Sequence, residues 1–287
     1  MGVILLTDQH DRTLLALKRL NQSNLVPVGS PAPIAMPAGL TPDGQGNLIV
    51  ADRVNDRLVI RDLWSGAWQS FGSRGAGQGQ FFAPAAVAAD AQSRVYVADA
   101  GNHRVVRMDD LSGSGWTTFG TAGKPTKADP VAEGMFAEPR GIAIDGLGRI
   151  LVTDPGAGRA VRFDDMAGAG WAELPLPFGP APNQPFGIAA GGGQVAITDV
   201  GNSLVHVFDI DDNLLVTLAG AAEGIPVPAF VAFDDAALVV ADIVSNELRR
   251  YLLRSSTLVL EEKLRGSGPE LITSLFQQIG GIASGGR

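Results

Sequence analysis

One pattern recurs six times along this chain of 287 residues: a short apolar run that ends in a small residue or threonine followed by aspartate. Successive copies are 43 to 55 residues apart, and they end at Asp8, Asp52, Asp99, Asp154, Asp199 and Asp242. Repeats of about 40–50 residues with strand-like composition are typical of sheets arranged radially around an axis. The repeat therefore predicts a circular array of sheets.

Each period holds four strand-like segments. A Pro-x-Gly-type start leads into the first, the apolar run ending in aspartate is the second, and two further segments follow. Short stretches rich in Val and Ile, bounded by Gly, Asp or Asn, are typical of strands and hairpins. The apolar runs do not alternate with polar residues, which indicates strands covered on both faces. We therefore predict an all-β fold, a six-bladed β-propeller with four-stranded antiparallel blades.

The two ends of the chain complete one repeat between them. Joined, the tail from residue 276 to 287 and the head from 2 to 8 match the uninterrupted stretch from 136 to 154. We predict that a C-terminal strand completes the N-terminal blade, which is built from about 3–30 plus about 279–287. Such pairing leaves no open edge between the first and last blades and closes the ring. Residues 1–287 then form a single domain.

Composition narrows the classes of partner. The 37 Gly and 18 Pro indicate many turns, and the net charge of −8 argues against a nucleic-acid or anionic-membrane surface. No apolar stretch approaches the roughly 20 residues of a membrane-spanning helix, so a soluble protein is expected. Cysteine is absent, which rules out disulfides. The location stays open: cytoplasmic if the chain is full length, exported if a leader precedes it.

Two segments in the second and third repeats carry a family resemblance. They read Phe71-Gly-Ser-Arg-Gly-Ala-Gly-Gln-Gly-Gln-Phe-Phe-Ala-Pro84 and Val95-Tyr-Val-Ala-Asp-Ala-Gly-Asn-His-Arg-Val105. They resemble an NHL repeat, with Asn102 and His103 at its name-giving positions. The resemblance covers essentially the whole chain and implies a six-bladed propeller. NHL propellers include protein and RNA binders, sensor domains of bacterial kinases and a zinc-dependent lyase, so the fold does not select among these functions.

The residues shared by the repeats are interpreted as scaffold. An aspartate present in all six copies is expected to accept backbone N–H bonds from its own turn rather than to form a metal ring. Arg57, Arg104 and Arg159, each five residues after its aspartate, are expected to bridge to a neighbouring carboxylate. The in-phase residues Trp68 and Trp116, with Trp171, are interpreted as packing, with an exposed partner surface as the alternative.

A functional site is expected where the repeats differ, at the x position of the Pro-x-Gly start. That position is predicted to point toward the mouth of the central channel, and its six occupants are Gly280, Ala38, Ala85, Arg140, Phe186 and Ala229. Arg53 is predicted to lie on the same face as Arg140 and Phe186. Two guanidiniums beside an aromatic ring are suited to bind a carboxylate or phosphate ligand. The alternative is that Arg140 pairs with Glu138, Asp154 or another acid while Phe186 plugs the channel.

The positions of the histidines and carboxylates indicate a metal-binding site only weakly. His10 and His103 follow their aspartates and join the candidate ligand-binding residues, whereas His206 is expected to be a packed strand residue. The resemblance implies a zinc site of histidines at channel positions in the lyase relatives, and no histidine stands at an x position here. No carboxylate or amide stands there either, which removes the ligands expected for calcium in propeller lactonases. No cofactor is predicted. Binding of Ca²⁺ or Zn²⁺ by residues of the loops stays an open alternative.

Three classes of function follow. The favoured one is a non-catalytic binding scaffold that takes a protein, a peptide or a small acidic ligand at the channel mouth or through loops 120–138. The alternative is a hydrolase or lyase acting at the channel mouth, with or without a metal. The third is a structural subunit of a larger assembly, and the chain is otherwise expected to be a monomer. No nucleophile elbow, phosphate loop or Cys-His pair is present.

Overall fold

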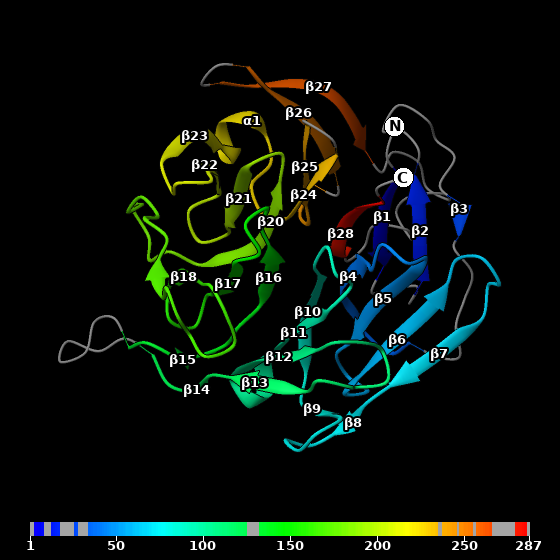
Figure 1. Cartoon of the computed structure of the whole chain (residues 1–287). Coiled ribbons are helices and arrows are strands. Elements are labelled where there is room, and N and C mark those ends of the chain that lie inside the picture. The colour runs from blue at the N-terminus through cyan, green and yellow to red at the C-terminus, as the bar shows by residue number, and fades with distance from the viewer. Residues whose placement is uncertain are drawn as a thin grey trace.

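The computed structural model places most of the chain in β-strands around a common centre (Figure 1). The residues that it describes are 3–8, 13–17, 26–27, 34–124, 132–234, 237–245, 247–254, 257–265 and 279–285. His10 lies outside them, so its predicted role stays a prediction. Within the described residues the helices are η1 (Ala100–Asn102) and α1 (Gly220–Glu223), and neither is long and apolar enough to cross a membrane.

Five four-stranded antiparallel sheets are each formed by a contiguous part of the chain. The first is β4 (Pro37–Pro42), β5 (Asn47–Asp52), β6 (Arg57–Asp62) and β7 (Trp68–Phe71). The second is β10 (Pro84–Ala89), β11 (Val95–Asp99), β12 (Arg104–Met108) and β13 (Thr117–Phe119). The third is β16 (Gly141–Ile144), β17 (Ile150–Asp154), β18 (Arg159–Phe163) and β19 (Ala172–Glu173). The fourth is β20 (Pro185–Gly191), β21 (Gln194–Asp199), β22 (Leu204–Asp209) and β23 (Leu214–Ala219). The fifth is β24 (Pro228–Asp234), β25 (Ala237–Asp242), β26 (Glu247–Arg254) and β27 (Thr257–Arg265).

A further four-stranded sheet joins the two ends of the chain. Its strand order is β28-β1-β2-β3, from β1 (Val3–Asp8), β2 (Thr13–Leu17), β3 (Val26–Pro27) and β28 (Ile279–Gly285). The C-terminal strand pairs antiparallel with the first strand, with Leu6 opposite Ile282. The first strands of the sheets contact one another in the order β4, β10, β16, β20, β24 and β28, and β28 contacts β4 (Figure 1).

The fold is thus an all-β propeller with four-stranded antiparallel blades, as the repeat predicts. Its core lies between neighbouring blades rather than at the centre. One buried cluster joins Ile49 and Leu58 of the first blade to Val97 and Val106 of the second, and similar clusters join the next pairs of blades. A strand packed between two blades is buried on both faces, which explains why the apolar runs do not alternate.

The aspartates that end the second strands hold the start of their own blade. Asp99 is buried and accepts hydrogen bonds from the Phe82 N–H at 2.7 Å and from Asn102 Nδ2 at 2.8 Å. Asp154 accepts the N–H groups of residues 137 and 138 at 2.8 and 2.7 Å. The prediction of a scaffold role is confirmed for the five aspartates whose side chains the structure describes, Asp52, Asp99, Asp154, Asp199 and Asp242. The expectation that their donors come from their own turn is wrong in part, because several donors lie 15 to 17 residues earlier.

The third-strand arginines hold the crossovers between blades. Arg104 pairs with Asp99 at 2.8 Å and also donates to the carbonyls of Ala76 at 2.7 Å and Gln80 at 2.9 Å. Ala76 lies between the two strands of the short parallel pair β8 (Ser73–Arg74) and β9 (Gln80–Phe81), and Gln80 is the first residue of β9. A second such pair, β14 (Thr121–Ala122) and β15 (Met135–Phe136), precedes the third blade. Arg159 pairs with Glu173 on the fourth strand of its own blade at 2.6 Å, and it also donates to the Met135 carbonyl of β15 at 2.9 Å.

The periodic tryptophans pack against aromatic rings. The Trp116 ring lies 5.4 Å from that of Phe81, and the Trp171 ring stacks on Phe163 at 5.7 Å. Trp68 is half-buried, with the Arg61 guanidinium 5.0 Å from its ring centroid. The interpretation as packing is confirmed for Trp116 and Trp171, which pack against buried clusters between blades, and it stays a prediction for Trp68. The most exposed tryptophan is instead Trp64, in the hairpin between β6 and β7.

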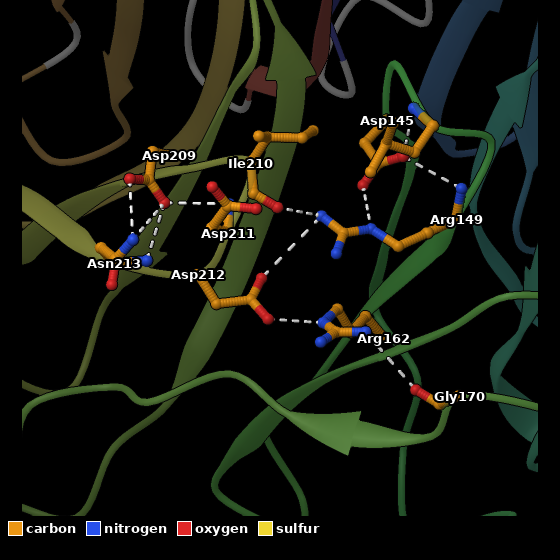
Figure 2. A network of polar contacts seen from close by, with 10 residues as sticks. Asp145, Arg149, Arg162, Gly170, Asp209, Ile210, Asp211, Asp212 and Asn213 are labelled. Atoms are coloured by element: carbon orange, nitrogen blue, oxygen red, sulfur yellow. Dashed lines mark hydrogen bonds and ion pairs between the residues drawn. The ribbon is translucent and has the colours of Figure 1, made fainter.

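A polar network ties the third and fourth blades together at the ends of their strands away from Asp154 (Figure 2). Arg149 pairs with Asp145 of its own hairpin at 2.6 Å and donates to the Ile210 carbonyl of the next blade at 2.6 Å. Arg162 pairs with Asp212 at 2.5 Å. The third and fourth blades are therefore joined by ionic contacts as well as by apolar packing.

Candidate functional site

Residues of four blades meet on the face where the first strands begin, which we call the mouth face. Arg53 follows β5, Arg140 directly precedes β16, and Phe186 is the second residue of β20. The structure brings these three predicted residues together. It adds two that the sequence did not single out as ligand contacts, namely Glu138 from the loop before β16 and Phe230 from β24.

One carboxylate oxygen lies between two guanidiniums. Glu138 Oε1 is 2.7 Å from Arg140 Nη2 and 3.6 Å from Arg53 Nη2. Arg53 reaches it from two blades away, and the blade between them carries only Ala85 at the equivalent x position. The predicted pairing of Arg140 with Glu138 is therefore confirmed, while Asp154 contacts the backbone of this loop instead.

An aromatic pair lies beside the guanidiniums. The Arg140 Cζ atom is 5.6 Å from the centroid of the Phe186 ring, within the range of a cation–π contact. The Phe186 ring meets that of Phe230 edge to face at 5.5 Å and 74°. Both phenylalanines are half-buried, so their rings line the mouth face without being fully covered. The arrangement offers charge and apolar surface side by side.

The charge of this cluster opposes that of the whole chain. Two guanidiniums and one carboxylate leave one positive charge in excess, whereas the chain carries a net charge of −8. Arg140 Nε is buried and has no hydrogen-bond partner among the described residues. The cluster therefore attracts anions locally and keeps donor capacity that Glu138 does not use.

Thr153 sets the position of Phe186 relative to Arg140. Its hydroxyl accepts the Gly141 N–H at 2.8 Å and donates to the Phe186 carbonyl of the next blade at 2.6 Å, while its carbonyl accepts the Arg140 N–H at 2.8 Å. A Cβ on Gly141 would lie 2.6 Å from the Phe186 carbonyl oxygen, so only glycine permits this approach. The hydroxyl thus fixes the two x residues against each other.

The remaining x positions do not contribute to the site. Ala38, Ala85 and Ala229 are buried rather than exposed at the mouth, and Gly280 lies in β28. These alanines therefore offer no exposed side chain to a ligand, and the direction of their x positions stays a prediction. Among the x residues, only Arg140 and Phe186 have large side chains, and both are half-buried rather than fully covered by the first strands.

The histidines are placed differently from one another. His103 lies beside the site, where its Nδ1–H donates to the Ala137 carbonyl at 2.8 Å, next to Glu138 in the chain. His206 is fully buried in β22, with Nδ1 3.0 Å from Thr217 Oγ1, and burial lowers its pKa. The interpretation of His206 as a packed residue is confirmed.

The buried aspartates of the repeats do not gather. Burial raises the pKa of both Asp99 and Asp154, against the opposing effect of their hydrogen bonds. Within the part of the chain that the structure describes, no group of three or more His, Cys, Asp or Glu side chains is placed to hold a metal ion. The described aspartates instead accept hydrogen bonds from backbone and side-chain donors of their own blades.

Glu138, Thr153 and Phe230 are the residues of this site that sequence reasoning missed or ranked too low. One signal for Thr153 is present in the sequence. The residue before the repeated aspartate is alanine in three copies and threonine in three, at Thr7, Thr153 and Thr198. Thr198 makes the same link one blade later, because it accepts the Gly187 N–H and donates to the Ala229 carbonyl.

Replacing Thr153 by valine is expected to lower the free energy of unfolding by about 2 kcal/mol, because a buried N–H and a carbonyl lose their partner. Thr198→Val is the comparison, because its hydroxyl makes the same two kinds of bond, with the Gly187 N–H and the Ala229 carbonyl, and we expect a similar loss. Thr153→Val should also shift the NMR resonances of the Phe186 ring and the Arg140 side chain, whereas Thr198→Val, which loses the Gly187 N–H bond next to Phe186, should leave those of Arg140 unchanged. Identical spectra at these two residues would show that Thr153 does not position them.

Comparison with known proteins supports the fold alone. No protein-family model matches the sequence, and no curated protein does. A structure of the nidogen/laminin complex superposes with a TM-score of 0.74 at 15% identity, covering 99% of this chain and 98% of that one. A catalytically inactive virginiamycin B lyase from Staphylococcus aureus with quinupristin gives 0.63 at 11%, covering 87% and 77%. A streptogramin B lyase gives 0.63 at 13%, covering 91% and 83%. The chain is thus similar in fold to both a binding propeller and lyase propellers.

Proposed function

We propose that this chain is an NHL-type, six-bladed propeller, closed by β28, that binds an acidic ligand at its mouth face. The observation that carries the proposal is the convergence of Arg53 and Arg140 on one carboxylate oxygen beside Phe186 and Phe230. Planar guanidiniums recognise carboxylates through paired N–H donors, and aromatic rings accept an apolar group next to the charge. Support for ring closure comes from the β28–β1 pairing and the contact of β28 with β4.

The ligand class follows from this pairing of chemistry. A carboxylate attached to an apolar or aromatic group, such as the C-terminal residue or an acidic segment of a peptide or protein, matches the cluster. The nidogen/laminin structure is a protein complex formed by a propeller of the same fold, which agrees with a protein or peptide partner here. The net charge of −8 disfavours nucleic acid as the ligand.

Replacing Arg140 by alanine is expected to weaken binding of N-acetyl-phenylalanine by about tenfold, since a charge-assisted hydrogen bond is lost. The melting temperature should not change, because the side chain is partly exposed and its ion pair is near the surface. Calorimetric titration measures the affinity, and the C-terminal amide of the same compound tests the need for the carboxylate.

Arg107→Ala is the matched control for this substitution. The Arg107 side chain is 24% exposed, as is that of Arg140, and it pairs with Asp109 at 3.2 Å on another part of the blade surface. Binding should be unchanged in this variant. If Arg140→Ala instead lowers the melting temperature and leaves binding intact, Arg140 is a structural residue and the proposal fails.

The orientation of His103 supports a second candidate, a hydrolase or lyase at the mouth face. Because the Ala137 carbonyl accepts a hydrogen bond from Nδ1–H, the lone pair of the neutral ring is on Nε2, which can act as a base. Incubation with quinupristin, followed by mass spectrometry, tests for lyase or hydrolase activity like that of the neighbouring fold. Turnover lost in His103→Ala would favour the enzyme, and its loss on chelation would add a metal. No turnover by the wild-type protein would leave the binding function.

A further inference from the structure

Glu138 is held in place by its backbone rather than by its side chain. The Glu138 N–H donates to Asp154 Oδ1 at 2.7 Å, and the preceding N–H donates to the other oxygen of that carboxylate at 2.8 Å. The carbonyl of residue 137 accepts the His103 Nδ1–H at 2.8 Å. The backbone thus presents the Glu138 side chain to the mouth face whether or not its carboxylate is bound.

The carboxylate itself is the more exposed partner of its ion pairs. The Glu138 side chain is 41% exposed, compared with 24% for Arg140 and 21% for Arg53. The contact with Arg140 is a close ion pair at 2.7 Å, whereas Arg53 at 3.6 Å is beyond hydrogen-bonding distance. Ion pairs of this exposure contribute little to stability and exchange with solvent. The carboxylate can leave the guanidiniums at small cost.

From this geometry we infer that Glu138 is a built-in competitor, an internal carboxylate that occupies the anion-binding position of the mouth face until a ligand carboxylate replaces it. The inference rests on the proposed binding function and adds how that site is regulated. Arg53 and Arg140 are both satisfied, in part, by a group with the chemistry of the proposed ligand. A ligand therefore gains only the difference between its own contacts and those of Glu138.

This competition selects the class of ligand. A neutral compound cannot displace an ionised carboxylate from two guanidiniums, so it gains the apolar contact with Phe186 alone. A carboxylate that contacts Arg53 and Arg140 at once makes better use of them than Glu138 does, because Glu138 leaves Arg53 at 3.6 Å.

Removing the charge of Glu138 should therefore tighten binding. In Glu138→Gln we expect the affinity for N-acetyl-phenylalanine to rise by about five- to tenfold, because repulsion of the incoming carboxylate and competition for the guanidiniums are both removed. The C-terminal amide of the compound should show no such gain. Glu138→Ala, which lacks any side-chain acceptor, should bind at least as tightly, and its melting temperature checks that the fold is kept.

Glu173→Gln is the matched control. The Glu173 side chain is 39% exposed, close to the 41% of Glu138, and it pairs with Arg159 at 2.6 Å. Unchanged binding in this variant, with tighter binding in both Glu138 variants, supports the inference. Wild-type binding that is lost in Arg140→Ala yet equal or weaker in Glu138→Gln overturns the competitor role and leaves the binding function standing. Absence of binding in the wild type and in both Glu138 variants overturns the binding function, and the inference with it.

Discussion

Substituting alanine for Asp99 is expected to lower the free energy of unfolding by about 3–5 kcal/mol, the loss typical of breaking one side of a buried ion pair. The carboxylate is fully buried and accepts hydrogen bonds from the Phe82 N–H, Asn102 Nδ2 and Arg104 Nε, all within 2.8 Å. Alanine leaves these donors without their acceptor, and the Arg104 side chain is only 11% exposed. Denaturation by urea measures the change.

Asp110→Ala in the same blade is the control for this effect. Asp110 is exposed and accepts the N–H of Ser112 at 2.8 Å, a turn interaction that solvent can replace. Its loss is expected to be below about 1 kcal/mol. Asp99→Asn keeps one acceptor oxygen and should fall between the two. Equal losses for Asp99→Ala and Asp110→Ala would contradict the role of the repeated aspartates as anchors of the blades.

Acidification is expected to destabilise the protein through His206. Burial lowers the pKa of this ring below its ordinary value of 6.5, with attraction to Asp199 opposing the effect. The unfolded chain therefore binds a proton near pH 6.5, whereas the folded protein does so only at lower pH. Because the unfolded state binds more protons in that interval, stability is lost as the pH falls from about 6.5 to the folded pKa, by about 1.4 kcal/mol per pH unit.

His206→Leu isolates this contribution, because other groups titrate alike in both proteins. The difference in unfolding free energy between the variant and the wild type should be constant above about pH 7.5 and should shift in favour of leucine as the pH falls below 6.5. Phe208→Leu, a substitution at a buried position of the same strand, should give a difference that does not depend on pH. Parallel curves for wild type and His206→Leu would show that His206 titrates alike in both states.

Most of the architecture could be predicted because it repeats. The aspartate at the end of each second strand, the apolar run before it and the turn residues around it recur in phase, so their spacing alone indicates blades. The same periodicity separates scaffold from site. Asp99 and Asp154 anchor blades as predicted, whereas Arg140 and Phe186 stand out because the other x residues are small.

The candidate site could be predicted only in part. Arg140 and Phe186 are predicted as departures from the repeat and Arg53 from its place directly after a repeated aspartate, and the three do lie together. Glu138 is predicted only as one of several acids for Arg140. Phe230 stands at the third residue of the Pro-x-Gly start, where four of the six copies have glycine, and only the structure connects this departure to the site. The hydroxyl of Thr153 reaches a carbonyl 33 residues later, a contact that no local pattern reports.

By itself the sequence determined the strand positions, the repeated aspartate anchors and the residues that break the repeat, because each of these depends on chemistry that recurs locally along the chain. Only the tertiary structure decided which of those exceptional residues meet. Arg53 and Glu138 belong to blades that are not neighbours, and their approach depends on the curvature of the ring and on the small residue between them. The excess positive charge at the mouth face is therefore a property of the assembled blades.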